Sequence, residues 1–207
     1  VLADLLTVAE RLGQDRVARG DLLVAWVGDG NNMANSWLEA AALLGFEIRM
    51  ACPQGYGPDP ALLARAGAKA RLVAAPAEAM RGAHVVNTDV WTSMGQEAEA
   101  EERRRAFRDH RVDRKGLALA DPSAIVLHCL PAHRGEEIEE EVLEGPQSAV
   151  FDEAENRLHV QKAVMALTMA RAKATRCCSP PLNLPGLSSA RSCSPTTSRN
   201  SLAILMD

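Results

Sequence analysis

The chain has 207 residues, 47% of them hydrophobic, and carries 23 basic and 27 acidic side chains, a formal net charge of −4. This length and apolar content are sufficient for one well-buried domain, while the acidic balance offers no basic field for nucleic acid or an anionic membrane. No apolar run approaches the ~20 residues of a membrane-spanning helix, and the first residues show no signal-peptide pattern.

The first half of the chain alternates between helical patterns and short apolar runs. Leucine and valine recur at helical spacing over residues 1–12, which predicts a helix, and the apolar run 22–27 predicts a buried strand followed by a turn at 28–32. The elements expected next are a helix at 35–44, a strand at 47–51, a helix at 58–66, a strand at 70–73, a helix at 76–81, a strand at 84–88 and a loop at 89–96.

A charged helix is predicted over 97–108, where Glu99–Arg103 and Glu101–Arg105 stand at the favourable i,i+4 spacing of a solvated face. The apolar run 124–127 predicts a strand that opens onto a loop at 128–135. An acidic helix at 136–144, a short strand at 149–151 and a helix from 153 to about 172 complete the pattern. This alternation predicts an α/β fold, with a Rossmann-like, mostly parallel sheet and helices on both faces.

Beyond about residue 174 the composition changes to serine and proline without an apolar period, which predicts a disordered tail over 174–207 and a single α/β domain over 1–173. The chain has five cysteines, and three of them, Cys177, Cys178 and Cys193, are in this tail. An odd number placed in this way argues against a disulfide framework and favours a reducing compartment, so we expect a cytoplasmic protein.

Four polar segments, 28–32, 89–95, 128–135 and 152–157, follow the predicted strands and should meet at one edge of the sheet, where parallel sheets bind ligands. Each has a simpler interpretation on its own. The first is a tight turn, Asp89 is a helix cap, and Cys129 is a small buried hydrophobe. His128 and His133 form an i,i+5 pair without a third ligand nearby. The acidic run at 136–144 is most simply a solvated helix face, so no metal site is expected.

Three of these segments resemble the signature sequences of ornithine carbamoyltransferases. They are Asp-Val-Trp-Thr-Ser-Met-Gly-Gln-Glu at 89–97, His-Cys-Leu-Pro at 128–131 and Phe-Asp-Glu-Ala-Glu-Asn-Arg at 151–157, and Gly-Asp-Gly-Asn-Asn at 28–32 fits the same family in order and spacing. The resemblance covers residues 1 to about 172. It implies transfer of a carbamoyl group from carbamoyl phosphate to the δ-amine of ornithine, which gives citrulline and phosphate without a cofactor.

The resemblance also implies roles for individual residues. Asp89 would pair with the α-ammonium group of ornithine, and burial beside Cys129 would lower the pKa of the δ-amine, with a thiol or thiolate relaying its proton. Arg157 would stabilise the charge that develops on the carbamoyl oxygen. His128 would donate to the backbone and shape the loop. The implied site residues are Asn32, Asp89, Ser93 and Met94 at the amino-acid end of ornithine, Cys129 and Leu130 at the reacting amine, and Arg157.

The family also has an N-terminal domain whose Ser-x-Arg-Thr loop holds carbamoyl phosphate, and no segment of this sequence corresponds to it. We therefore expect the ornithine-binding half, weakly active or inactive by itself, and we leave open whether it joins the trimer common in the family. A carbamoyltransferase for putrescine or an acylated ornithine, or a non-catalytic binding module, remain alternatives. A nicotinamide-dependent oxidoreductase fits less well, because the turn at 28–32 lacks the third glycine and Glu47 meets the acidic position only loosely.

Overall fold

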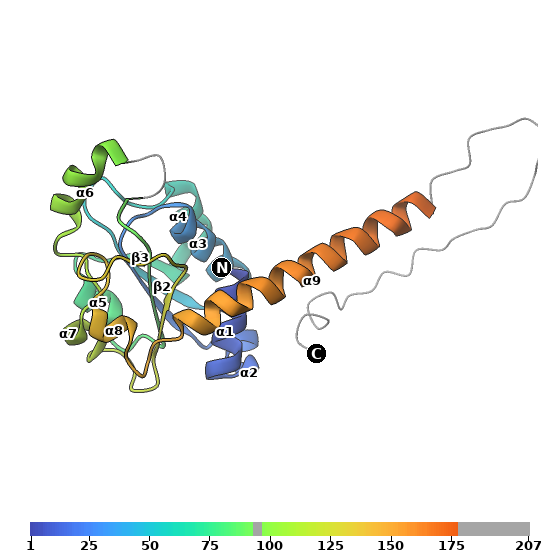
Figure 1. The fold of residues 1–207 in the computed structure, drawn as a ribbon, viewed down its shortest axis with the longest axis horizontal. Coiled ribbons are helices and arrows are strands. Elements are labelled where there is room, and N and C mark those ends of the chain that lie inside the picture. Colours follow the sequence, from blue (N-terminus) through green and yellow to red (C-terminus); the bar gives the residue numbers. More distant parts are fainter. Residues whose placement is uncertain (93–96, 178–207) are drawn as a thin grey trace, which may run out of the picture. The chain divides into compact units, whose positions relative to one another are not determined.

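The structure is a computed structural model that describes residues 1–92 and 97–177 (Figure 1). The chain divides into two compact units, Val1–Arg157 and Leu158–Asp207, and the first contains the sheet. Ser93, Met94 and residues 178–207, most of the predicted tail, lie outside the described residues. Among the described helices, none combines the length and the apolar character needed to cross a membrane.

Five parallel strands form the sheet, in the order β3-β2-β1-β4-β5. The α/β fold with a parallel sheet is therefore confirmed. The chain adds β2 and β3 on one side of β1 and then β4 and β5 on the other, so the strand order reverses between β1 and β4. Ligands of open α/β sheets bind at such a switch point. The strands are β1 (Leu23–Val27), β2 (Glu47–Ala51), β3 (Ala70–Leu72), β4 (Val85–Thr88) and β5 (Ile125–His128).

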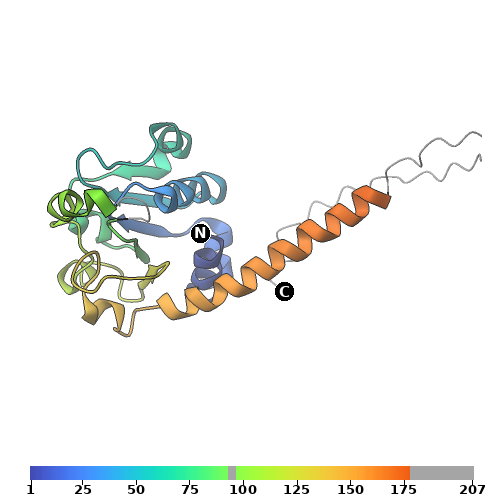
Figure 2. The ribbon, with the colours of Figure 1, turned by 45° about the horizontal axis from the view of Figure 1, so that its top comes forward.

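Two hydrophobic clusters lie on opposite faces of the sheet, because successive strand residues point in opposite directions. Val24 and Trp26 of β1 belong to a cluster with α1, α3 and α4, whereas Ala25 and Val27 belong to one with α5, α7 and α8. Helices thus cover both faces (Figure 2). The described helices are α1 (Leu2–Leu12), α2 (Gln14–Arg19), α3 (Asn32–Leu44), α4 (Pro60–Ala66), α5 (Pro76–Met80), α6 (Ala100–Phe107), α7 (Arg114–Leu117), α8 (Glu140–Leu143) and α9 (Val150–Cys177), with 3-10 turns η1 (Gly67–Lys69) and η2 (Glu97–Glu99).

The predicted strand at 149–151 is wrong. Ser148 forms an isolated parallel bridge with Val126, and α9 then begins at Val150. The bridge is held by two hydrogen bonds, from Val126 N–H to the Gln147 carbonyl at 2.8 Å and from Ala149 N–H to the Val126 carbonyl at 2.9 Å. A helix forms here in place of the predicted strand. It is favoured by the acidic residues of its first turn, which stabilise the helix N-terminus.

The predicted helix at 136–144 shortens to α8, Glu140–Leu143. The residues before it form a turn, which is closed by a 2.9 Å hydrogen bond from Gly135 N–H to the Ile138 carbonyl. Two short helices, α2 and α7, were not predicted, because six and four residues are too few to show a helical period.

Candidate active site

The turn after β1 and the residues after β4 lie side by side at the switch point. Val27 pairs with Thr88, and the Thr88 hydroxyl donates to the Val27 carbonyl at 2.6 Å. Gly28 has φ +132°, and a Cβ atom on Gly30 would stand 2.2 Å from the backbone of Gly57. Both glycines are therefore required by the local backbone, as expected for a tight turn.

Asn31 is the residue that this turn places at the centre of the site. Its Oδ1 accepts from the backbone N–H groups of Met33 and Ala34, at 2.9 and 3.1 Å, and so caps α3. Its Nδ2 donates to Oδ2 of Asp89 at 2.7 Å. The residue predicted for the site is the neighbouring Asn32, which is exposed at the start of α3. An asparagine before an apolar helical run is an N-cap signature that could have identified Asn31 and the earlier helix start.

Asp89 is 6% exposed and directly follows β4. Its side chain contacts Asn31, in the turn after β1, and Cys129, which follows β5. Its Oδ1 accepts from its neighbour Val90 N–H at 2.8 Å and from the Cys129 thiol at 3.3 Å. The contact with Cys129 follows from the register of the sheet. Thr88 and His128, the last residues of β4 and β5, are paired, so Asp89 and Cys129, which follow them, lie side by side. The structure thus brings Asp89 and Cys129 together, with Asn31 as the third member.

The Cys129 thiol is neutral. Burial raises its pKa strongly, and the negative charge and hydrogen bond of Asp89 raise it further. A protonated thiol that donates to Asp89 does not accept a proton, so the geometry supports a thiol and not the thiolate that the sequence left open. Asp89 is the acceptor of this pair.

His128 is fully buried and holds the loop that follows β5. Its Nδ1 accepts from Leu130 N–H at 2.9 Å, so a neutral ring carries its proton on Nε2, which lies 3.3 Å from Oε1 of Glu137. The ring therefore accepts from the backbone, the reverse of the predicted direction. Leu130 has φ +50°, an unfavourable conformation for a residue with a Cβ atom, and the His128 contact helps to hold it.

The segment 152–157 lies in the first turns of α9, in agreement with the helix predicted from residue 153. Its buried Glu153 accepts from His128 N–H at 2.9 Å, and its buried Asn156 donates to Thr7 and Glu10 of α1 at 3.0 and 2.7 Å. Arg157 is exposed, and in the described part of the chain it has no hydrogen bond or ion pair with the other candidate residues. The structure therefore does not bring Arg157 to Asp89.

Arg103, on α6, ties the turn after β1 to the segment after β4. It is 3% exposed, pairs with the Asp29 carboxylate and donates from Nε to the Trp91 carbonyl at 2.7 Å. Its guanidinium lies 4.9 Å from the ring centre of Tyr56. The prediction that Arg103 lies on a solvated face is wrong, whereas the predicted Glu101–Arg105 pair is present at 3.4 Å. Nothing in the local charge pattern marks Arg103 as buried.

Two groups of side chains offer metal-ligand atoms within 4.8 Å of one another in the described residues, Asp89 with His128 and Cys129, and His133 with Glu136 and Glu137. The first group suits a cation poorly, because both ring nitrogens of His128 are engaged and the Cys129 thiol keeps its proton. The second group lies on the turn after the loop.

Comparison with known proteins shows which family this chain resembles. The Asp/Orn-binding domain of the aspartate/ornithine carbamoyltransferase family matches residues 20–168. The chain is 55% identical over 173 residues to the ornithine carbamoyltransferase of Syntrophotalea carbinolica and 56% identical over 173 residues to that of Geobacter sulfurreducens. Each match covers 82% of this chain and 56% of the relative, so the chain spans about half the length of these proteins.

Solved structures give the same result. The crystal structure of ornithine carbamoyltransferase from Thermus thermophilus superimposes with a TM-score of 0.70 at 51% identity, covering 79% of this chain and 52% of that one. The anabolic ornithine carbamoyltransferase of Campylobacter jejuni superimposes with a TM-score of 0.74 at 41% identity, covering 82% and 57%.

Proposed function

The chain belongs to the aspartate/ornithine carbamoyltransferase family, and we propose that its Asp/Orn-binding domain holds ornithine for carbamoyl transfer from carbamoyl phosphate. The observation that carries this proposal is the buried Asp89 carboxylate at the switch point, fixed by Asn31 and Cys129. A fixed carboxylate with little exposure to water is suited to pair with the α-ammonium group of an amino acid.

The amino-acid end of ornithine also needs donors and acceptors for its α-carboxylate. Asn32 is exposed beside the Asn31–Asp89 pair, and its amide both donates and accepts. We assign the same end of the substrate to Ser93 and Met94 from the family resemblance, since both follow Asp89 closely in the sequence.

In the reaction, the δ-nitrogen forms a bond to the carbamoyl carbon, and the bond from that carbon to the phosphate oxygen breaks with its electron pair on phosphate. The amine attacks only after its ammonium form releases a proton to solvent, and the proton that the nitrogen gives up when the new bond forms passes to the departing phosphate. Burial near Cys129 would lower the pKa of the amine, and we assign the carbonyls of Cys129 and Leu130 to orient it. We assign to the Cys129 thiol, which donates to Asp89, the role of holding this carboxylate in place.

Arg157 is our assignment for the carbamoyl oxygen, where a fixed guanidinium would stabilise developing negative charge. Support comes from the neighbouring Glu153, which attaches the start of α9 to the loop after β5. The chain spans about half the length of its relatives, and we propose that this part of the protein binds ornithine. Binding of carbamoyl phosphate is a proposal from the family resemblance, and a cytoplasmic location is a proposal from the number and placement of the cysteines.

Calorimetric titration with ornithine tests this function. We expect binding to the unaltered chain and an affinity at least about tenfold lower for Asp89→Asn, which keeps the shape but removes the charge of a charge-assisted hydrogen bond. Asp59→Asn is the matched control, because Asp59 caps α4 and asparagine caps equally well.

Putrescine serves as the second ligand, since it lacks the α-carboxylate and the α-amino-acid group. Equal affinities for ornithine and putrescine, or equal ornithine binding by the unaltered chain and Asp89→Asn, would contradict the proposed site.

A further inference from the structure

Glu137 has an oxygen that the loop after β5 does not use. The side chain is fully buried. Its Oε1 accepts from His133 N–H at 2.5 Å and lies 3.3 Å from His128 Nε2. Its Oε2 is equally inaccessible to water and has no hydrogen-bond partner among the described residues. A buried carboxylate oxygen without a partner is unfavourable, which indicates that another group satisfies it.

The side chains around this oxygen, imidazole and carboxylate groups, are of the types that bind divalent transition metals. Nδ1 of His133 lies 3.7 Å from Oε2, which is within the range of an ion pair when the imidazole is protonated but too far for a hydrogen bond. Two ligands of one tetrahedral zinc ion, with bonds of about 2.0–2.2 Å, stand about 3.4 Å apart. Glu136 offers a third ligand atom within 4.8 Å of both. We propose that His133, Glu136 and Glu137 form a binding site for a divalent cation of the zinc class, outside the ornithine pocket.

Charge and access support this site. One neutral imidazole and two carboxylates balance a divalent cation, and mixed nitrogen and oxygen ligands suit zinc or cobalt better than calcium or magnesium. His133 is half exposed, with 55% of its side chain accessible, and gives the ion a path from solvent, while a water molecule fills the fourth position.

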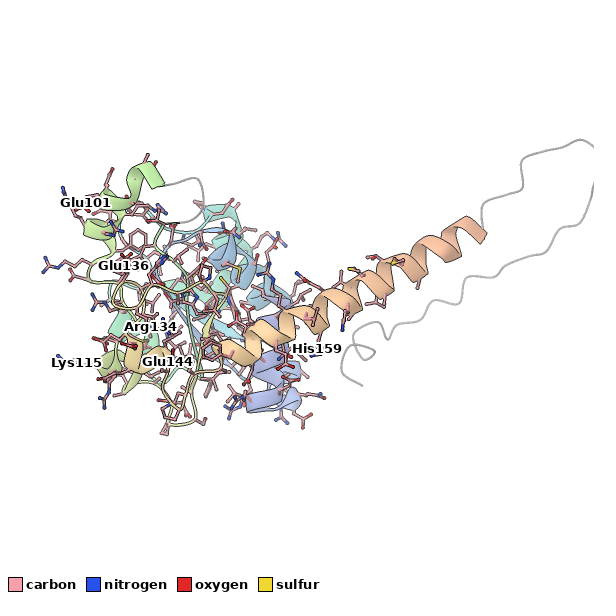
Figure 3. All side chains as sticks on the ribbon, in the orientation of Figure 1. Glu101, Lys115, Arg134, Glu136, Glu144 and His159 are labelled. Atoms are coloured by element: carbon pink, nitrogen blue, oxygen red, sulfur yellow. The ribbon has the colours of Figure 1, made fainter. Side chains whose placement is uncertain are left out.

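Three arginines stand near the site, and none occupies it. Arg104 pairs with Oε1 of Glu136 at 3.1 Å, and an exposed ion pair of this kind is weak enough for a metal to share the carboxylate. Arg111 donates to the backbone carbonyl of Glu136 at 2.9 Å. Arg134 pairs with Glu144 at 2.6 Å, which draws its charge away from the site (both residues, with Glu136, are labelled in Figure 3).

Titration of the full chain with Co²⁺ and Zn²⁺, followed by calorimetry and by the absorption of bound Co²⁺, tests the proposal without any substrate. We expect one equivalent that shows weak visible bands and no thiolate charge-transfer band, which separates it from cysteine ligation. In His133→Ala and Glu136→Gln the affinity of this equivalent should fall by more than about tenfold, because even outer-shell partners contribute that much.

His159→Ala removes another exposed histidine and is the matched control, expected to bind as the unaltered chain does. The far-ultraviolet circular dichroism of each variant checks that the fold is kept. The proposal is wrong if the unaltered chain binds cobalt with a thiolate band alone or not at all. Unchanged binding by His133→Ala, or loss of binding in His159→Ala, would equally overturn it.

Discussion

Nδ2 of Asn31 donates to Oδ2 of Asp89 at 2.7 Å, across the point where the strand order of the sheet reverses. The same Asn31 side chain caps α3 through its Oδ1. One residue therefore fixes both the start of a helix and the orientation of the carboxylate that we assign to the substrate ammonium. Changes at Asn31 should affect stability and ligand binding together.

Asn31→Ala should lower the free energy of unfolding by about 1 kcal/mol through the lost cap and should also weaken ornithine binding, because Asp89 loses its anchor. Asp59→Ala, which removes the cap of α4, should lower stability by a similar amount and leave the ornithine affinity unchanged. Urea denaturation and calorimetric titration measure the two effects. Equal ornithine affinities in both variants would show that Asn31 does not position Asp89.

Arg103→Met should destabilise the fold by about 3–5 kcal/mol, because it leaves the Asp29 carboxylate buried without its partner. Burial already raises the pKa of Asp29 even with Arg103 beside it. Arg105→Met, on the exposed face of the same helix, should change stability by less than about 0.5 kcal/mol. Chemical denaturation measures the free energy of unfolding of both variants. Similar free energies for the two would mean that the buried Arg103–Asp29 pair does not stabilise the fold.

Cys129 should react slowly with iodoacetamide at pH 8, at least about tenfold slower than a free cysteine with a pKa of about 8.5. The reason is that burial, and then Asp89, raises the pKa of the thiol. Asp89→Asn removes the negative charge and should accelerate the reaction. Mass spectrometry of the Cys129 peptide follows the modification, which separates it from the other cysteines. A rate as high as in the urea-unfolded chain would contradict a buried neutral thiol.

Glu153 should make the fold less stable as the pH rises. Burial, and then the neighbouring Asp4, raises the pKa of Glu153 from 4.5 to about 8. Between these two values the folded protein binds more protons than the unfolded chain, so the free energy of unfolding falls with rising pH, by at most about 1.4 kcal/mol per pH unit. Below the pKa that Glu153 has in the unfolded chain, no stability is lost. Above the pKa that it has in the folded protein, the loss of stability is complete.

Glu153→Gln should abolish this component, because glutamine has no proton to lose and still accepts from His128 N–H. The measurement is the urea midpoint of both proteins from pH 5 to pH 8, with Glu102→Gln on the exposed face of α6 as the control. Parallel pH dependences of the unaltered chain and Glu153→Gln would show that the carboxyl group titrates normally.

Hydrophobic periodicity predicted the parallel sheet well, because buried strands such as Leu23–Val27 are continuous apolar runs between turn signals. It failed at Ala149 and Val150, because only the preceding Ser148 forms a bridge to β5 and a helix begins at Val150. Length alone does not separate these outcomes. The acidic residues that follow favour a helix, because negative charge in the first turn stabilises the helix N-terminus.

Burial and backbone conformation leave a local record in the chain, so strands β1 to β5, the turn glycines and the residue types after each strand can be predicted from apolar runs and turn residues. Which of these residues come into contact depends on the folded chain. Register sets Asp89 beside Cys129, the cap at Asn31 supplies the third contact, and folding of α6 turns Arg103 inward to Asp29. Such contacts join residues tens of positions apart, and a local pattern of hydrophobicity and charge carries no information about pairs at that distance.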